Sequence, residues 1–145
     1  MPDYRLREFD LERDYEPILA LWSNSGPGIG ISPSDTREAL ALKLTRDPDL
    51  FLVAESDGQV IGTVVGGWDG RRGLVYHLAV DARYRRQRIG HALMSELERR
   101  LRMRGCRRVW LMVHHDNQAA IAFYESAGWE KIPVQPMGKR LEVGS

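Results

Sequence analysis

The sequence predicts a mixed α/β (α+β) protein, in which a mostly antiparallel central sheet of about seven strands is flanked by about four helices. Segments with the two-residue period of strands alternate with segments of helical period, in the order β-α-α-β-β-β-α-β-α-β-β. The chain has 145 residues, of which 43% are hydrophobic and 28% charged, as in one globular domain. We therefore expect a single domain over residues 1–145.

The first helices are predicted from capping residues and apolar spacing. A strand over residues 4–9 is followed by Asp10, a good N-cap, and by apolar positions at helical spacing through Trp22. After a loop over residues 23–34, Ser34 or Asp35 can cap a second helix. That helix should end near Asp47, because a proline follows it and disfavours helical backbone in the preceding residue.

Three strands are predicted next. Residues 50–55 and 59–68 are apolar, β-branched runs joined by Ser56-Asp57-Gly58, which indicates a hairpin. A turn over residues 69–73 leads to a third strand over residues 74–80. These strands should pair antiparallel.

The second half of the chain predicts two helices and three strands. A helix over residues 90–104 should end at Gly105, with Glu96–Arg100 and Glu98–Arg102 pairs on its surface. Residues 108–113 are continuously apolar, which predicts a strand buried on both faces and parallel to the strand before the helix. Asp116 or Asn117 should cap a last helix that stops at Gly128. Residues 129–132 and 137–141 are expected to form two short closing strands.

The charge of the chain is nearly balanced but unevenly distributed. The net charge is +1, yet residues 1–70 carry 6 basic and 13 acidic side chains and residues 71–108 carry 12 and 3. A basic block of this kind predicts an anionic partner, either a phosphate-bearing ligand or nucleic acid. No helix-turn-helix or aromatic stacking strand accompanies these arginines, so we expect no nucleic-acid partner.

Cysteine content and hydropathy predict a cytoplasmic protein. Cys106 is the single cysteine, so the chain cannot form an internal disulfide. The N-terminus is too charged for a secretory signal. The longest uncharged run, residues 17–34, is interrupted by Pro27 and Pro33, so we expect no membrane segment.

The segment over residues 78–93 predicts a phosphate site. An apolar strand runs through a short basic loop into a helix N-terminus, where unpaired amides and the helix dipole attract anions. Arg85, Arg86 and Arg88 can add charge-assisted hydrogen bonds. A plain strand-to-helix turn is the alternative. Neither a P-loop nor a dinucleotide-binding glycine pattern is present at this position.

Two motifs in this half resemble a known family. Residues 85–90, RRQRIG, resemble the [RQ]-x-x-G-x-[GA] loop of the GNAT superfamily of acyl-CoA-dependent N-acetyltransferases, with Arg88 where the family usually has glycine. Residues 117–129, NQAAIAFYESAGW, are similar to its N-x-x-A-x-x-[FL]-Y-x-x-x-G-[FW] helix. The resemblance covers residues 73–130 well and residues 4–70 in element order only.

The resemblance implies that a splayed pair of parallel strands binds the pantetheine arm of acetyl-CoA. Backbone groups of Leu78 and Val80 would pair with this arm, and Asn117 would help to hold it. We expect no metal, because the adjacent His114 and His115 point to opposite sides and make a poor ligand pair. The predicted cofactor-binding residues are Leu78, Ala79, Val80, Arg85, Arg86, Gln87, Arg88, Ile89, Gly90, His91, Ala92, Asn117 and Tyr124.

Tyr124 falls where many relatives place the general acid that returns a proton to the CoA thiolate. The alternative is an aromatic side chain that packs in the core. For the general base, the strand before the loop offers Tyr76 and His77, and strand alternation should place only one of them on the substrate side. Tyr76, acting through a water, is our predicted base, although a structural role is open for both residues.

These observations predict an N-acetyltransferase that moves an acetyl group from acetyl-CoA to a primary amine of a small molecule or protein. Cys106 has no base at recognisable spacing, so direct attack in a ternary complex is expected rather than an acyl-enzyme. The acceptor should bind among the loop over residues 23–34, the turn over residues 68–73 and the closing hairpin. The alternative is a non-catalytic CoA-binding sensor. Either can be a monomer or a homodimer.

Overall fold

The computed structural model describes residues 3–25 and 29–143. The chain forms two compact units that meet in sequence between Leu111 and Met112. A single domain over the whole chain therefore stays a prediction, and each unit is described by itself.

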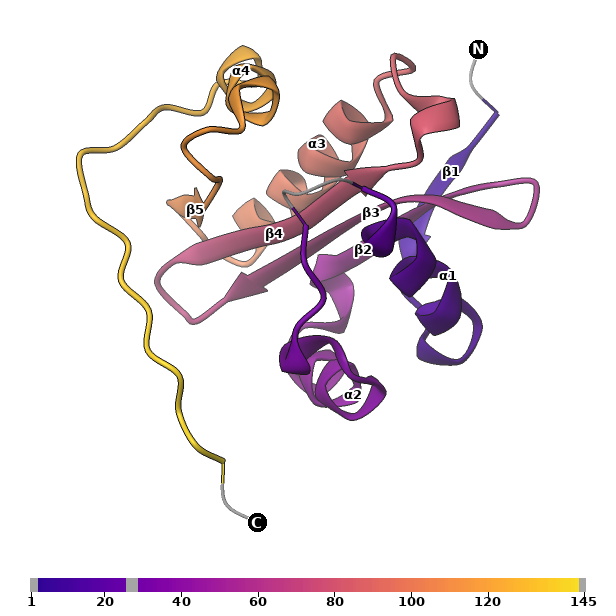
Figure 1. Cartoon of the computed structure of the whole chain (residues 1–145), viewed down its shortest axis with the longest axis horizontal. Helices are drawn as coiled ribbons and strands as arrows, with labels where there is room; N and C mark the ends of the chain where they lie inside the picture. The colour runs from indigo at the N-terminus through magenta and orange to yellow at the C-terminus, as the bar shows by residue number, and fades with distance from the viewer. Residues whose placement is uncertain (1–2, 26–28, 144–145) are drawn as a thin grey trace. The chain divides into compact units, whose positions relative to one another are not determined.

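The first unit contains a five-stranded sheet and three α-helices in its described residues (Figure 1). Three short 3₁₀ turns lie between these helices and strands, at Pro33–Asp35, Pro48–Leu50 and Ala82–Tyr84. The elements in chain order are β1 (Arg5–Glu8), α1 (Leu11–Ser23), α2 (Arg37–Arg46), β2 (Phe51–Ser56), β3 (Gln59–Trp68), β4 (Gly73–Val80), α3 (Ile89–Met103) and β5 (Val109–Leu111).

The sheet has the order β1-β2-β3-β4-β5. The first four strands pair antiparallel, and β5 pairs parallel to β4, as the crossover through α3 predicts. The hairpin between β2 and β3 turns at Asp57 and Gly58, both with positive φ, which matches the twist of the strands. The mixed α/β class is therefore confirmed.

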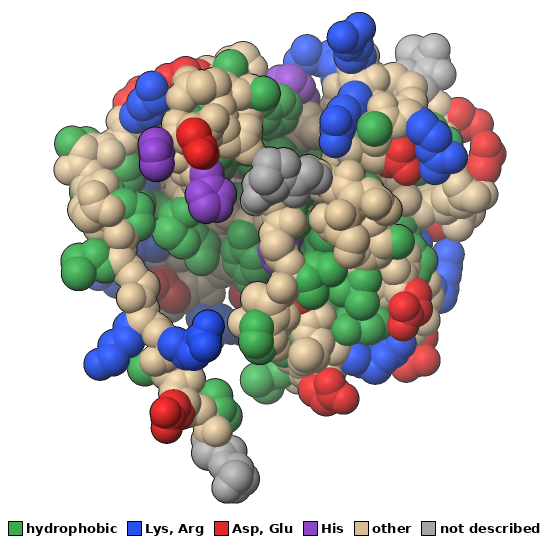
Figure 2. Space-filling view, in the orientation of Figure 1, with side chains coloured by type: hydrophobic (Ala, Val, Ile, Leu, Met, Phe, Trp, Pro, Cys, Tyr) green, Lys and Arg blue, Asp and Glu red, His purple; other side chains and the backbone are tan. Residues whose placement is uncertain are grey.

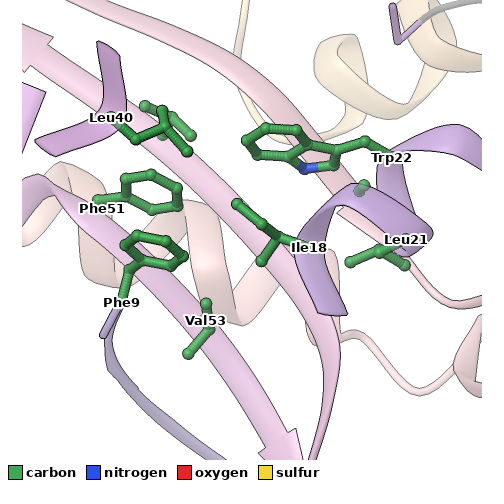
Figure 3. Packing of buried hydrophobic residues seen from close by; sticks show 9 residues of the cluster. Phe9, Ile18, Leu21, Trp22, Leu40, Phe51 and Val53 are labelled. Atoms are coloured by element: carbon green, nitrogen blue, oxygen red, sulfur yellow. The ribbon is translucent and has the colours of Figure 1, made fainter. Parts of the chain in front are cut away.

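The two faces of the sheet are covered by different helices (Figure 1). On the α1 face, Ile18 and Trp22 pack on the sheet, and Phe9 stacks on Phe51 with ring centroids 4.0 Å apart (Figure 3). On the opposite face, α3 packs closely because β3 carries glycine there. A Cβ at Gly66 would lie 2.6 Å from Leu97 Cδ1.

Most helix ends follow the predicted chemistry. Asp10 caps α1, and its carboxylate accepts hydrogen bonds from the amides of Glu12 and Arg13. The predicted cap of α2 is wrong: Thr36, rather than Ser34 or Asp35, accepts from the Ala39 amide. Asp35 is committed instead to the preceding turn, where its carboxylate accepts from the Ser32 amide.

The predicted glycine stop of α3 is confirmed. Gly105 has φ +95°, and the amides of Gly105 and Cys106 donate to the carbonyls of Arg102 and Leu101. This is the Schellman pattern that closes helix C-termini. The surface pair of Glu96 and Arg100 also forms, at 2.8 Å.

The prediction that residues 108–113 are buried on both faces is wrong. β5 spans only Val109–Leu111, and its residues are half-buried. The strand lies at the edge of the sheet, whereas continuous burial requires neighbours on both sides.

The second unit contains α4 (Gln118–Ser126) in its described part. Asn117 caps this helix, and Gly128, with φ +94°, ends it. The two predicted closing strands do not form: residues 129–132 and 137–141 are irregular, and Met137 is 92% exposed. Pro133 and Pro136 cannot donate to a strand ladder, which disfavours pairing here. The sheet therefore has five strands in the described residues rather than about seven.

Among the described residues, no helix is both long and apolar enough to cross a membrane.

Candidate functional site

The parallel pair of strands opens where the sequence predicts the ligand. β5 pairs only with the first three residues of β4, and the register ends at Val75–Leu111. On the side away from β3, the next five residues of β4, 76–80, have no strand partner among the described residues. Their backbone groups on that side can therefore pair with an extended ligand, as a strand would.

A bulge interrupts the same part of β4. Between the pairs Thr63–Ala79 and Val65–Tyr76, β4 places His77 and Leu78 opposite the single residue Val64. His77 takes φ +54°, a conformation that costs an L-residue roughly 1–2 kcal/mol. Thr63 secures the bulge, because its Oγ1 donates to the His77 carbonyl at 3.0 Å.

The bulge corrects our expectation that strand alternation turns Tyr76 and His77 to opposite faces of the sheet. Regular alternation would separate the two side chains, but their rings lie edge-on with centroids 5.6 Å apart. The extra residue shifts the alternation by one position, so both side chains turn toward the α1 face. The ring of His77 stacks on Trp22 at 4.3 Å.

Asp35 approaches the bulge from the turn before α2. Its Oδ1 lies 3.3 Å from His77 Nε2, and its side chain is only 4% exposed. The Ser32 amide donates to Oδ2 at 3.0 Å, and the hydroxyl of Tyr15 donates to the Asp35 carbonyl at 3.2 Å. A buried carboxylate thus orients a histidine at the bulge of β4.

Burial raises the pKa of Tyr76, and the negative charges of Asp35 and Asp47 add to this effect. The phenol nevertheless remains 40% exposed at its edge of the sheet. At neutral pH it is a hydrogen-bond donor rather than a proton acceptor.

The basic loop leads from β4 into α3 as predicted. Arg83, Arg85, Arg86 and Arg88 are all exposed, and Figure 2 shows Lys and Arg side chains gathered in the upper part of the view, around this loop. Arg83 pairs with Asp81 at 3.0 Å, and Arg85 donates to the Val80 carbonyl at 3.3 Å. The N-terminus of α3 has no side-chain cap, because Arg88 occupies the cap position without accepting a hydrogen bond.

Arg88 has φ +61° and Arg86 has φ +70°. This backbone explains why a glycine suits the position of Arg88, since glycine adopts positive φ without steric cost.

The other residues of this unit that we predict to bind the cofactor differ in how deeply they are buried. Ala79 and Ile89 are buried, so only their backbone can reach a ligand. Leu78 and Val80 are half-buried on the open stretch of β4, and Gln87 is exposed in the loop. Gly90, His91 and Ala92 form the first turn of α3.

In the second unit, Asn117 caps α4 by accepting from the Ala120 amide at 3.2 Å. Tyr124 lies between the aromatic rings of Phe123 and Trp129, at 5.3 and 6.0 Å. Burial raises the pKa of its phenol, which keeps the hydroxyl protonated at neutral pH.

The predicted acceptor regions are only partly defined. Within the loop over residues 23–34, residues 26–28 lie outside the described residues. The turn at Asp69 forms, with its carboxylate accepting from the amides of Arg71 and Arg72. The closing hairpin does not form.

Sequence reasoning missed Asp35, Trp22 and Thr63 as parts of this site. The sequence predicts a helix cap at Asp35 and an apolar helix position at Trp22. A bulge depends on how a strand pairs with its neighbour, so only the fold reveals their meeting with His77.

Solved structures share this architecture. The chain is 28% identical to Ard1 from Thermoplasma volcanium, with a TM-score of 0.76 over 88% of this chain and 82% of that one. It also resembles the PaiA N-acetyltransferase from Thermoplasma acidophilum, solved with coenzyme A, at 22% identity and TM-score 0.76, over 92% and 94% of the two chains. The fold is therefore that of known acetyltransferases.

The family follows from the sequence comparison. Residues 10–129 match the acetyltransferase (GNAT) family model, and an acetyltransferase of Pectobacterium atrosepticum is 42% identical over 129 residues, 88% of this chain and 89% of its own length. The chain belongs to the GNAT family of acetyltransferases, which confirms the resemblance stated from the two motifs.

Proposed function

We propose that this protein transfers an acetyl group from acetyl-CoA to a primary amine of a small molecule or protein, by direct attack in a ternary complex. The observation that carries this proposal is the open stretch of β4 over residues 76–80. The basic loop connects this stretch to the uncapped N-terminus of α3. One continuous segment thus offers unpaired strand backbone, then a basic loop, then helix amides. Pantetheine and pyrophosphate require these features in the same order.

The residues of the first unit fit the chemistry of CoA. The amides of the pantetheine arm can pair with backbone groups of Leu78 and Val80, in the manner of an added strand. The phosphates carry negative charge, which the α3 dipole and the exposed Arg86 and Arg88 stabilise. The solved PaiA relative, an N-acetyltransferase with coenzyme A bound, supports this choice of ligand.

Acetyl-CoA supplies an activated acyl group on a thioester. Tyr124 can donate its phenolic proton to the departing sulfur, and the raised pKa of Tyr124 keeps that proton in place until the sulfur becomes basic. Asn117 retains its side-chain amide N–H groups for the pantetheine arm, because the α4 cap uses only its oxygen.

The experiment measures binding and turnover separately. Acetyl-CoA is titrated by calorimetry into the parent protein and the Gly90→Asp variant, whose carboxylate would face the phosphates at the start of α3. Turnover with a broad panel of primary amines is then followed by thiol release, in the parent and in Tyr124→Phe. We expect Gly90→Asp to lose binding. Tyr124→Phe should keep binding and melting temperature, while kcat falls by about 10²–10⁴-fold.

Each arm has a result that contradicts its part of the proposal. Equal acetyl-CoA affinity in Gly90→Asp would place the phosphates elsewhere. Equal turnover in Tyr124→Phe would show that water protonates the thiolate. Tight binding of acetyl-CoA by a parent protein that acetylates no amine would favour the CoA-binding sensor.

A further inference from the structure

His77 occupies a position that the surrounding residues define from several directions. The Thr63 hydroxyl donates to its carbonyl at 3.0 Å and in turn accepts from Trp22 Nε1 at 2.9 Å. Thr63 and Trp22 are fully buried. The left-handed backbone of His77 is therefore held by packed groups, and strained residues held in this way are concentrated at functional sites.

The ring of His77 is oriented as tightly as its backbone. Trp22 stacks on one side at 4.3 Å, and Asp35 Oδ1 lies 3.3 Å from Nε2. A carboxylate next to Nε2 favours the proton on that nitrogen, which leaves the lone pair on Nδ1. Among residues 3–25 and 29–143, no side chain or backbone group is hydrogen-bonded to Nδ1.

The position of His77 relates it to the proposed ligand. It is the second residue of the open stretch of β4, directly before Leu78, whose backbone would pair with the pantetheine arm. Its side chain is 16% exposed, so it can be reached without being fully solvated. Bulges beside active sites commonly redirect one side chain in this way.

We infer that His77 is the general base that deprotonates the acceptor amine, and that Asp35 is the positioning residue that orients it. This inference rests on the proposed function. It replaces our sequence-based choice of Tyr76 by its neighbour.

Several charged or titratable groups surround His77. Asp35 faces it from the turn before α2, and Tyr76 from β4. Tyr15 on α1 contacts the Asp35 carbonyl and lies under the guanidinium of Arg37. Tyr76 is the competing base, but its raised pKa leaves the phenol protonated at neutral pH.

The proposed step conserves protons and electrons. His77 takes one proton from the acceptor ammonium and later releases it to solvent. The amine lone pair then forms the carbon–nitrogen bond, and the carbon–sulfur bond breaks with its electron pair left on sulfur. Tyr124 gives its proton to that sulfur and regains one from the acylated nitrogen. The products are the amide, the CoA thiol and one released proton.

The test compares two acceptors that differ in amine basicity. One is an alkylamine accepted by the parent protein, with an amine pKa near 10. The other is its β,β,β-trifluorinated analogue, whose three fluorines lower the amine pKa enough that the amine is mostly unprotonated at the assay pH. His77→Asn is the main variant, because asparagine tolerates the left-handed backbone, and His77→Gln is the second.

If His77 is the base, the loss of kcat/KM in its variants should depend on the acceptor. With the alkylamine, kcat/KM of His77→Asn should fall by about 10²–10⁴-fold, and with the fluorinated amine by less than about tenfold. Asp35→Asn should show the same dependence with a smaller loss in kcat and an unchanged KM. His115→Gln, at an exposed histidine to which the proposal gives no role, should match the parent protein.

Acetyl-CoA affinity and melting temperature of each variant separate chemistry from folding. Equal losses with both acceptors, or no loss in His77→Asn and His77→Gln, would overturn the role of His77 while leaving acetyl transfer itself established. If the parent protein binds acetyl-CoA but acetylates no amine, the proposed function fails and the role of His77 fails with it.

Discussion

Arg88 places a long charged side chain on a backbone that suits glycine. Its φ of +61° lies in the left-handed region, where a Cβ crowds the carbonyl that follows. The residue is exposed and gains no side-chain cap at the start of α3. We therefore expect its charge to offset the strain only through contact with the proposed phosphates.

We predict that Arg88→Gly stabilises the protein while weakening ligand binding. Relief of the left-handed strain outweighs the greater entropy of an unfolded glycine, which gives a net gain of about 0.5–1 kcal/mol. Chemical denaturation measures this gain, and calorimetry with CoA measures the loss of a charge contact. Arg83→Gly is the control, since Arg83 lies in the preceding turn and pairs with Asp81. A lower stability in Arg88→Gly would contradict the strain argument.

At the scale of elements, α3 is stabilised by ion pairs on its exposed face. Glu96 contacts Arg99 at 2.6 Å and Arg100 at 2.8 Å. Hydrogen bonds from these two arginines lower the pKa of Glu96 to about 2. Arg100 also reaches Glu8, so this pairing ties the helix to the end of β1.

The lowered pKa predicts how this stabilisation depends on pH. A carboxylate whose pKa falls from 4.5 to about 2 on folding stabilises the folded state fully above the unfolded pKa. That contribution is lost as the pH falls toward the folded pKa. We predict that Glu96→Gln destabilises the protein by about 1 kcal/mol at pH 7, since the group is partly solvated. The difference from the parent protein in denaturation experiments should shrink below pH 4.5 and vanish only below about pH 2.

Glu98 on the same helix is the matched control. Burial raises the pKa of Glu98, and its contact with Arg102 is long, at 4.0 Å. The stability of Glu98→Gln relative to the parent protein should therefore not decrease as the pH rises from 2 to 7. A Glu96→Gln difference that stays constant across this range would show that packing, rather than charge, is lost.

At the scale of the whole molecule, charge is separated along the chain. Residues 1–70 carry 13 acidic and 6 basic side chains, whereas residues 71–108 carry 3 and 12. In the structure, the exposed arginines of this block include those of the loop between β4 and α3. An anionic ligand is therefore attracted to one region of the surface.

This distribution predicts that CoA affinity decreases with ionic strength. The loop arginines are exposed, so their attraction is screened over a Debye length of about 8 Å at physiological salt. Titrations of CoA at increasing salt concentrations measure the slope. An affinity that does not change with salt would show that pantetheine packing, and not phosphate contact, dominates binding.

Local features of the fold were predictable from sequence. The hairpin at Asp57-Gly58, the cap at Asp10 and the glycine stop at Gly105 each depend on residues a few positions apart. The basic loop and the helix after it are also local, which is why the family resemblance was visible there. The cap of α2 was missed because Asp35 has a competing local partner in Ser32.

The sequence by itself determined the mixed fold class, the order of the elements through α4 and the loop that can hold phosphate. Only the tertiary structure decided which side chains meet at β4. A bulge depends on how a strand registers with its neighbour, so no pattern within residues 74–80 could show that Tyr76 and His77 share a face. The contact of His77 with Asp35 likewise forms only when the turn before α2 packs over the sheet. Local chemistry therefore predicted the basic loop before α3, whereas the proposed base required contacts between segments distant in sequence.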